Sequence, residues 1–194
     1  MSEVMRALRR EHADMARLLH ALERQLDVFD GGGTPDYDIV QGVIDYCLDY
    51  PDLYHHPKED LVLERLRARD PEAAEAVGPL LPEHEALAAL TRRFAEAMDA
   101  IVHEAEVSRE AVADLAREFL EVYRKHIAME ESRFFPAALA ALEEADWQAI
   151  EAQLGERADP LFGNQADQRF ARLRQDILAW EKADEEAAGG AGAT

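Results

Sequence analysis

The sequence predicts an all-α protein: an antiparallel up-down-up-down four-helix bundle with an extra C-terminal helix. Three observations lead to this fold class. Four long segments carry apolar residues three and four positions apart, which is the period of an amphipathic helix. Ala, Leu, Glu and Arg are abundant and no convincing run of alternating β-branched residues occurs, a mixture that favours helices. With 194 residues and 48% hydrophobic content, the chain is long enough for one compact domain with a real core.

The first two helices of the bundle are expected at residues 2–29 and 37–68. The glycine-rich segment 30–35 ends the first helix firmly. Pro51 and Pro57 lie inside the second helix and are expected to kink it, because each removes a backbone donor and crowds the preceding turn.

The other two helices are expected at residues 71–104, with a break at Gly78-Pro79, and from residue 108 to about Pro136. Each of the four helices presents one apolar stripe to its neighbours.

Beyond the bundle the helical pattern weakens. A short helix is expected at 146–154, a loop at 155–163 and a last helix at 165–186. The narrow apolar stripe of the last helix is expected to pack across the bundle or against a second subunit, so both a monomer and a homodimer remain open. We therefore divide the chain into a bundle, a C-terminal helical extension and a disordered Gly/Ala tail, at residues 1–145, 146–188 and 189–194.

Composition excludes several classes of partner. The formal charge of −20 repels phosphate backbones and anionic lipid, so neither nucleic acid nor a membrane is an expected partner. Cys47 is the single cysteine, which excludes an internal disulfide and favours a reducing compartment. The chain has no apolar stretch of transmembrane length and no secretory segment at its start, so we expect a cytoplasmic protein.

The most informative feature is a repeated set of metal-ligand residues. Each copy has a Glu-His pair, a His about 42 residues further on, and a Glu four positions after that His, followed by a second acid. Such a duplication describes a repeated helical hairpin. The first copy consists of Glu11, His12, His55, Glu59 and Asp60, and the second of Glu83, His84, His126, Glu130 and Glu131.

Helix geometry predicts that these residues meet. At about 1.5 Å of rise per residue, the four histidines lie at similar heights in an antiparallel bundle, and each lies in the apolar stripe of its helix. Glu59 and Glu130 lie one turn beyond His55 and His126 on the same helix faces. Two buried carboxylates without a counter-charge are very unfavourable, whereas two metal ions would neutralise both.

Single histidines do not carry this prediction. One histidine on an apolar stripe is more often a hydrogen-bonded core residue than a ligand, and an isolated His-x-x-x-Glu is common on helices. Six such residues within one repeat predict a metal site at His12, His55, Glu59, His84, His126 and Glu130. His56 is expected to face a neighbouring helix or solvent, and His20 and His103 to lie on the surface.

Imidazole and carboxylate ligands in a helical bundle suit iron, with manganese and zinc as competitors. Ferritin-like di-iron bundles use Glu-x-x-His, whereas this chain has the reverse order. The order His-x-x-x-Glu, with a further histidine on the first and third helices, resembles the hemerythrin family and its HHE cation-binding branch. The resemblance covers about residues 3–140 and is most specific at His55-His56-Pro57-Lys58-Glu59-Asp60 and at His126-Ile127-Ala128-Met129-Glu130-Glu131.

This resemblance implies a non-haem centre of two iron ions bridged by an oxo or hydroxo group. The four histidines His12, His55, His84 and His126 would be terminal ligands, and Glu59 and Glu130 the bridges. Oxygen-carrying hemerythrins have a fifth histidine on the third helix, four residues from the other. The corresponding positions here are Leu80 and Ala88.

One iron would then lack a protein ligand, unless His56, Tyr54, Tyr123 or a water completes its coordination. An open position favours iron exchange, peroxide or NO chemistry and sensing over reversible oxygen carriage.

Four functions follow as alternatives. The first is a protein that binds O2, or senses O2 or iron status, with O2 or another small diatomic molecule or peroxide as its ligand. The second is a di-iron enzyme that decomposes peroxide or reduces NO. The third is an iron donor for iron–sulfur repair; larger family members with this role carry an N-terminal cysteine-bearing segment that is not found in this sequence. The fourth is a structural bundle with zinc or no metal.

Overall fold

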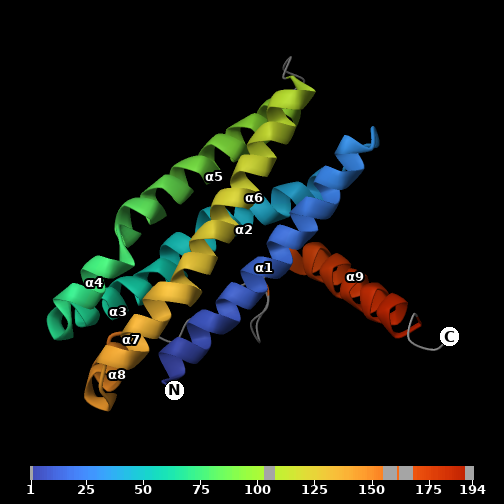
Figure 1. Cartoon of the computed structure of the whole chain (residues 1–194). Coiled ribbons are helices and arrows are strands. Elements are labelled where there is room, and N and C mark those ends of the chain that lie inside the picture. Colours follow the sequence, from blue (N-terminus) through green and yellow to red (C-terminus); the bar gives the residue numbers. More distant parts are fainter. Residues whose placement is uncertain (1, 103–107, 155–160, 162–167, 191–194) are drawn as a thin grey trace.

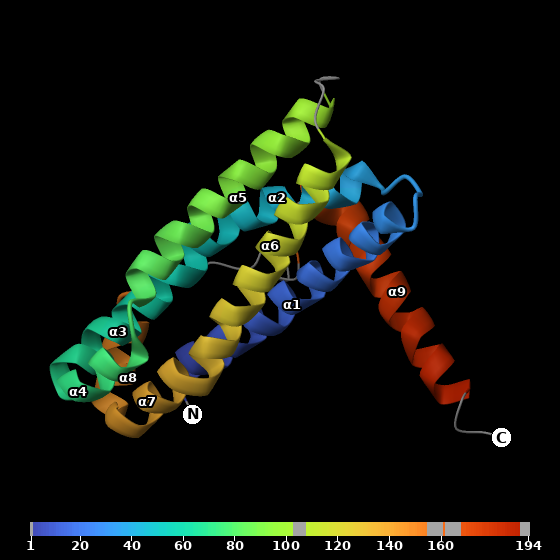
Figure 2. The same cartoon turned by 45° about the horizontal axis from the view of Figure 1, so that its top comes forward.

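The computed structural model describes residues 2–102, 108–154, 161 and 168–190, and these residues form helices and short connections without any β-strand. The predicted all-α class is therefore confirmed. Four long helical segments lie side by side (Figures 1 and 2).

The first long segment is α1 (Glu3–Asp30), and α2 (Tyr37–Tyr50) follows it after the glycine-rich turn. The Ser2 hydroxyl accepts a hydrogen bond from the backbone N–H of Met5 and caps α1. Gly32 takes a φ of 82°, a left-handed conformation that glycine adopts without strain.

The predicted kink in the second long segment is a π-helical turn. The turn η1 (Pro51–His55) separates α2 from α3 (His56–Arg69), and the N–H of His56 bonds to the carbonyl of Pro51, five residues earlier. One extra residue is thereby inserted just ahead of Pro57, and the side chains that follow are rotated relative to an uninterrupted α-helix.

The third long segment is broken where Gly78-Pro79 predicted it. The short helix α4 (Pro71–Val77) ends at Gly78, whose φ is 102°, and α5 (Leu80–Val102) follows. The predicted end of this segment at residue 104, together with His103, lies outside the described residues.

The fourth long segment contains a second π-helical turn, which the sequence analysis did not predict. It consists of α6 (Arg109–Met129), η2 (Glu130–Phe134) and α7 (Phe135–Ala141), and the N–H of Phe135 bonds to the carbonyl of Glu130. Like the first π turn, it ends two residues before a proline, here Pro136.

Three further elements follow the bundle: α8 (Glu144–Glu151), η3 (Gln168–Phe170) and α9 (Ala171–Gly190). α8 begins two residues before the predicted start, and the predicted loop at 155–163 lies outside the described residues except for Leu161. α9 contacts α1 and α2 and then projects away from them (Figure 2). It continues through Gly190, two residues into the predicted tail, and residues 191–194 lie outside the described part.

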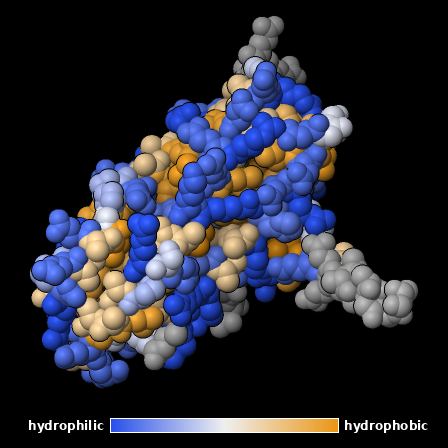
Figure 3. All heavy atoms as spheres, viewed as in Figure 1, coloured by the Kyte–Doolittle hydropathy of each residue, from blue (hydrophilic) through white to orange (hydrophobic). Residues whose placement is uncertain are grey.

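The hydrophobic core consists of two separate clusters. One is built around Met15, Leu19, Val43, Leu87 and Phe119, and the other around Leu8, Val62, Leu66, Leu80 and Phe134. In each long segment the predicted ligands lie between these clusters, so a polar layer crosses the core. Hydrophilic side chains cover most of the face in Figure 3, with hydrophobic ones visible between the helices. Among the described helices, none is both long and apolar enough to cross a bilayer.

Candidate metal centre

All six predicted ligands meet in the polar layer between the two hydrophobic clusters. His12 comes from α1, His55 from η1, Glu59 from α3, His84 from α5, His126 from α6 and Glu130 from the start of η2. None of the six is more than 6% exposed. The structure divides them, with one further histidine, into two groups whose candidate ligand atoms lie within 4.8 Å of one another.

The first group, called here the His12 group, contains His12, His55, Glu59 and Glu130. The Nε2 atoms of His12 and His55 lie 3.1 Å apart. His12 Nε2 lies 3.2 Å from Oε2 of Glu130, and His55 Nε2 lies 3.4 Å from Oε1 of Glu59. Phe135 stacks on the His12 ring, with ring centroids 5.0 Å apart, and closes this side of the group.

The second group, called here the His84 group, contains His56, Glu59, His84 and His126. His84 Nε2 lies 3.4 Å from Oε2 of Glu59, and His126 Nε2 lies 3.0 Å from Oε1 of Glu130. The rings of His56 and His84 are stacked, with centroids 3.8 Å apart. Three imidazoles therefore belong to this group and two to the other.

Glu59 and Glu130 lie between the two groups, and each turns one oxygen to either side. Oε1 of Glu59 faces His55 and its Oε2 faces His84, while Oε2 of Glu130 faces His12 and its Oε1 faces His126. Both oxygens of Glu59 and Oε2 of Glu130 are buried and make no hydrogen bond to any described residue. Buried carboxylate oxygens that face imidazole nitrogens are the donor set of a metal site, so the residues present fit bound cations.

A second ring of carboxylates orients the imidazoles. The Nδ1 atoms of His12, His55, His56 and His126 donate hydrogen bonds of 2.8–3.1 Å, while Nδ1 of His84 lies 3.8 Å from Oδ1 of Asp60. A histidine bound to an outer carboxylate through Nδ1 presents Nε2 inward, in the tautomer and orientation that a metal needs. The partners, in the order of these histidines, are Glu131, Glu11, Asp52 and Glu83.

The electrostatics of the layer show how the charges balance without a cation. Burial alone would lower the pKa of His55, but the charges of Glu59 and Glu11 outweigh it and raise that pKa to about 10. Burial likewise opposes charge on His84, yet Glu130 and Glu59 raise its pKa to about 9. Burial acts to raise the pKa of Glu130, but its close contacts with the imidazole nitrogens of His12, His126 and His84 hold that pKa well below the usual range. Without a cation, the protonated imidazoles therefore balance the negative charges of the buried carboxylates.

His56 is one of the groups that the sequence left open to complete the coordination. It is 6% exposed, belongs to the His84 group and stacks on His84 of the neighbouring helix α5, so it faces a neighbouring helix, as expected, and not solvent. The π turn η1 ends at His55 and turns both neighbouring histidines toward the core. Tyr123 hydrogen-bonds with Thr91 and Cys47 instead, and His20 is a surface residue as predicted, with a side chain 54% exposed.

Comparison with known proteins agrees with this geometry. The family model described as the hemerythrin HHE cation binding domain matches residues 4–138. The chain belongs to this family. Membership in the hemerythrin HHE family establishes a cation-binding domain, and the buried His/Glu groups lie within the matched residues. No curated protein and no solved structure matches the chain.

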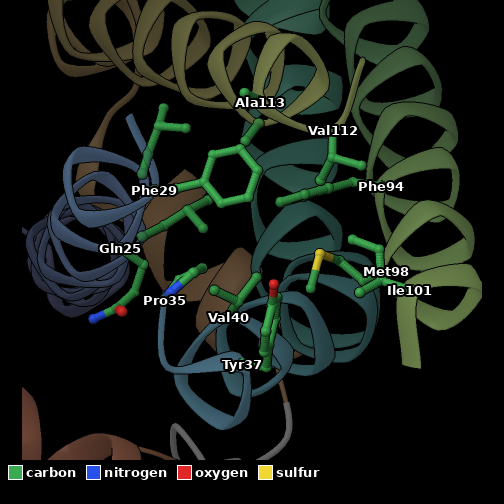
Figure 4. Close-up of a pocket in the computed structure, with 13 residues that line it drawn as sticks. Gln25, Phe29, Pro35, Tyr37, Val40, Phe94, Met98, Ile101, Val112 and Ala113 are labelled. Atoms are coloured by element: carbon green, nitrogen blue, oxygen red, sulfur yellow. The ribbon is translucent and has the colours of Figure 1, made fainter. Parts of the chain in front are cut away.

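A second concave feature lies at the other end of the bundle. It is an apolar pocket between α1, α2, α5 and α6, lined by side chains that include Phe29, Tyr37, Phe94 and Met98 (Figure 4). Gln25 is the one amide among its lining residues, and no acid, base or histidine lines it. The pocket therefore has no group that could bind a cation and is separate from the metal centre.

Proposed function

We propose that this chain is a non-haem di-iron protein that binds O2, or senses O2 or iron status, through a carboxylate-bridged centre. The observation that carries the proposal is the position of Glu59 and Glu130, each with one oxygen toward either group. Two carboxylates placed in this way can each bind one ion through each oxygen and so bridge two ions. A single ion would use only one side of this arrangement. The proposed ligands are the predicted six and His56.

The ligand count makes the two ion positions unequal. The His84 group offers three imidazoles and the His12 group two, while both share the two carboxylates. Iron prefers six ligands in such sites, so the ion in the His12 group would keep a position for a small ligand. When bound, the metal pair supplies redox chemistry and this coordination position. The protein supplies the buried layer that excludes water and the carboxylates that orient each imidazole.

Several finer features belong to this proposal. The four long segments would form the antiparallel up-down-up-down bundle of residues 1–145, with α9 as an extra helix of an extension at 146–188. A cytoplasmic location rests on Cys47, which is buried and unpaired. The acidic surface disfavours nucleic acid, and a monomer and a homodimer both remain compatible with it.

Metal analysis of protein purified without added metal tests the proposal most directly. We expect about two iron ions per chain and oxo-to-iron charge-transfer absorption in the near ultraviolet. One ion per chain, or zinc without iron, would contradict it. Mixing the diferric protein with hydrogen peroxide then separates binding from turnover: sustained oxygen release identifies the enzyme alternative, and a stable or simply bleached spectrum identifies the binding or sensing protein.

A further inference from the structure

A hollow of about 440 Å³ lies on the surface beside the metal centre. Its walls come from η1, α3 and α5, and its lining includes His56 and His84. These two histidines belong to the His84 group, so the hollow leads directly to ligands of the second ion position. Both side chains are more than nine-tenths buried.

Two facing polar atoms of residues that line the hollow, Nδ1 of His84 and Oδ1 of Asp60, have no hydrogen-bond partner within the described structure. Nδ1 of His84 makes no hydrogen bond within the described structure, since the nearest acid oxygen, Oδ1 of Asp60, is 3.8 Å away. That oxygen is itself buried and has no hydrogen-bond partner there. The other four histidines of the centre all have Nδ1 partners at hydrogen-bond distance. A buried carboxylate oxygen without a hydrogen-bond partner, in a residue that lines an accessible hollow, is a group that an incoming cation can bind.

The charge of the walls has the sign that attracts cations. Asp52, Asp60 and Glu85 line the hollow and Arg92 opposes them, which leaves an excess of negative charge. A concave surface of one sign focuses the field and raises the local concentration of oppositely charged ions. Glu85 is exposed and makes no hydrogen bond or ion pair with any described residue, so its charge is directed at solvent.

We propose that this hollow is the port through which divalent metal ions enter and leave the centre, with the Asp60 carboxylate as the first protein group to bind the incoming ion. The proposal rests on the metal centre proposed above. The ion exchanges water for the Asp60 carboxylate, then passes the ring of His84 to its Nε2 and the shared carboxylates. The ion exchanges its water for protein ligands and displaces protons from the imidazoles, and no electron is transferred. On the opposite side, Phe135 and the Lys58–Glu11 ion pair cover the His12 group.

Uptake of Co²⁺ by metal-free full-length protein, followed in a stopped-flow by visible absorption, tests the port. Glu85→Lys reverses a wall charge and touches no ligand. At about 0.1 M salt we expect uptake to slow about three- to tenfold, with an unchanged final amount of bound metal, and we expect the effect to vanish near 1 M salt. Glu96→Lys is the matched control, because it makes the same charge change on the same exposed side of α5, about 16 Å further along the helix.

A second pair of variants tests the route by size. Ala88 lines the hollow, and Ala88→Trp would fill it, so both uptake and removal by a chelator are expected to slow about tenfold or more. Ala97→Trp, also half-buried on α5, is expected to exchange metal at the wild-type rate.

Normal rates in both Glu85→Lys and Ala88→Trp, or equal slowing by Glu96→Lys, would overturn the port alone. A wild type that binds no metal under any condition would overturn the metal centre as well, so the two failures are distinguishable.

Discussion

Binding of metal to the metal-free protein is expected to release protons from the ligand histidines. The number of protons follows from the pKa values of these histidines. The pKa of His55 is raised to about 10 and that of His84 to about 9, so both rings are protonated at pH 7.5 in the metal-free state. A ligand imidazole must be neutral, and each ring therefore loses one proton. Glu59 and Glu130 have lowered pKa values and are already ionised, so they contribute none. We expect at least about two protons per chain.

The sign and size of the pH dependence follow. Protons compete with metal at every pH below the pKa of the metal-free histidines, so affinity rises with pH and levels off above about 9 to 10. Two protons per loading event give about a 100-fold gain in apparent affinity per pH unit, or about 2.7 kcal/mol.

Calorimetric titration of Zn²⁺ in buffers of different ionisation enthalpy measures the proton count directly. The His20→Ala variant is the control, because this exposed ring lies away from the layer and its loss leaves the count unchanged. Release of fewer than one proton per chain, or an affinity that is flat between pH 6.5 and 8.5, would refute the pairing of imidazolium and carboxylate in the metal-free layer.

Three further outcomes are expected. His56→Ala removes the third imidazole of the His84 group and is expected to lower the metal content from about two ions to about one, whereas retention of both would remove His56 from the site. Glu11→Gln leaves every ligand in place but weakens the hydrogen bond that orients His55, and a loss of about 10- to 100-fold in metal affinity is expected by equilibrium competition with a chelator. In the metal-free form, the contribution of His55 and His84 to stability is expected to be fully present at about pH 6.5 and to be lost as pH rises through about 9 to 10, because the folded-state histidines lose their protons there. Urea unfolding measures this loss, and a stability that rises from about pH 7 to about pH 10 would contradict it.

The main helices, and the meeting of the six predicted ligands in one layer, could be predicted from the sequence because both depend on periodicity. A stripe repeating every three or four residues identifies a helix face, and equal distances from two loops place residues at equal heights. Periodicity alone was enough to place His12, His84 and His126, because the chain around each of them is regular α-helix. The break at Gly78 was predicted for a different reason. This residue has a positive φ, a conformation that favours glycine.

The sequence left open whether His56 reaches the centre, because its position depends on backbone hydrogen bonding that the sequence does not encode locally. Pro51 and Pro57 predicted a distortion of the second helix. A proline can be accommodated either by a kink or by an inserted residue, and the sequence does not distinguish the two. The structure adopts the π turn, and the face of the helix changes at the point where two histidines are adjacent. The outer carboxylates were visible in the repeat as Glu11, Asp60, Glu83 and Glu131, yet their pairing with particular histidines depends on contacts between helices.

The duplication explains which parts of the centre are symmetric. In each copy, the acid before the first histidine bonds the second histidine: Glu11 bonds His55, and Glu83 bonds His126. The acids that follow Glu59 and Glu130 face the first histidine of the opposite copy, so the two hairpins complete one another's coordination across the layer. The orientation of His12 and of His84 therefore depends on acids of the opposite copy.

The pair of Asp52 and His56 breaks this symmetry. The positions 71 residues further along the chain, which correspond to it in the second copy, are Tyr123 and Ile127. Ile127 cannot bind metal, and Tyr123 is hydrogen-bonded to Thr91 and Cys47, so the second copy contributes no further ligand. A fully symmetric site would hold two equivalent ions, each with two imidazoles. Because one copy alone supplies a third imidazole, the two ions would differ in coordination, and a small ligand would be directed to the His12 group beneath Phe135, away from the port beside His84.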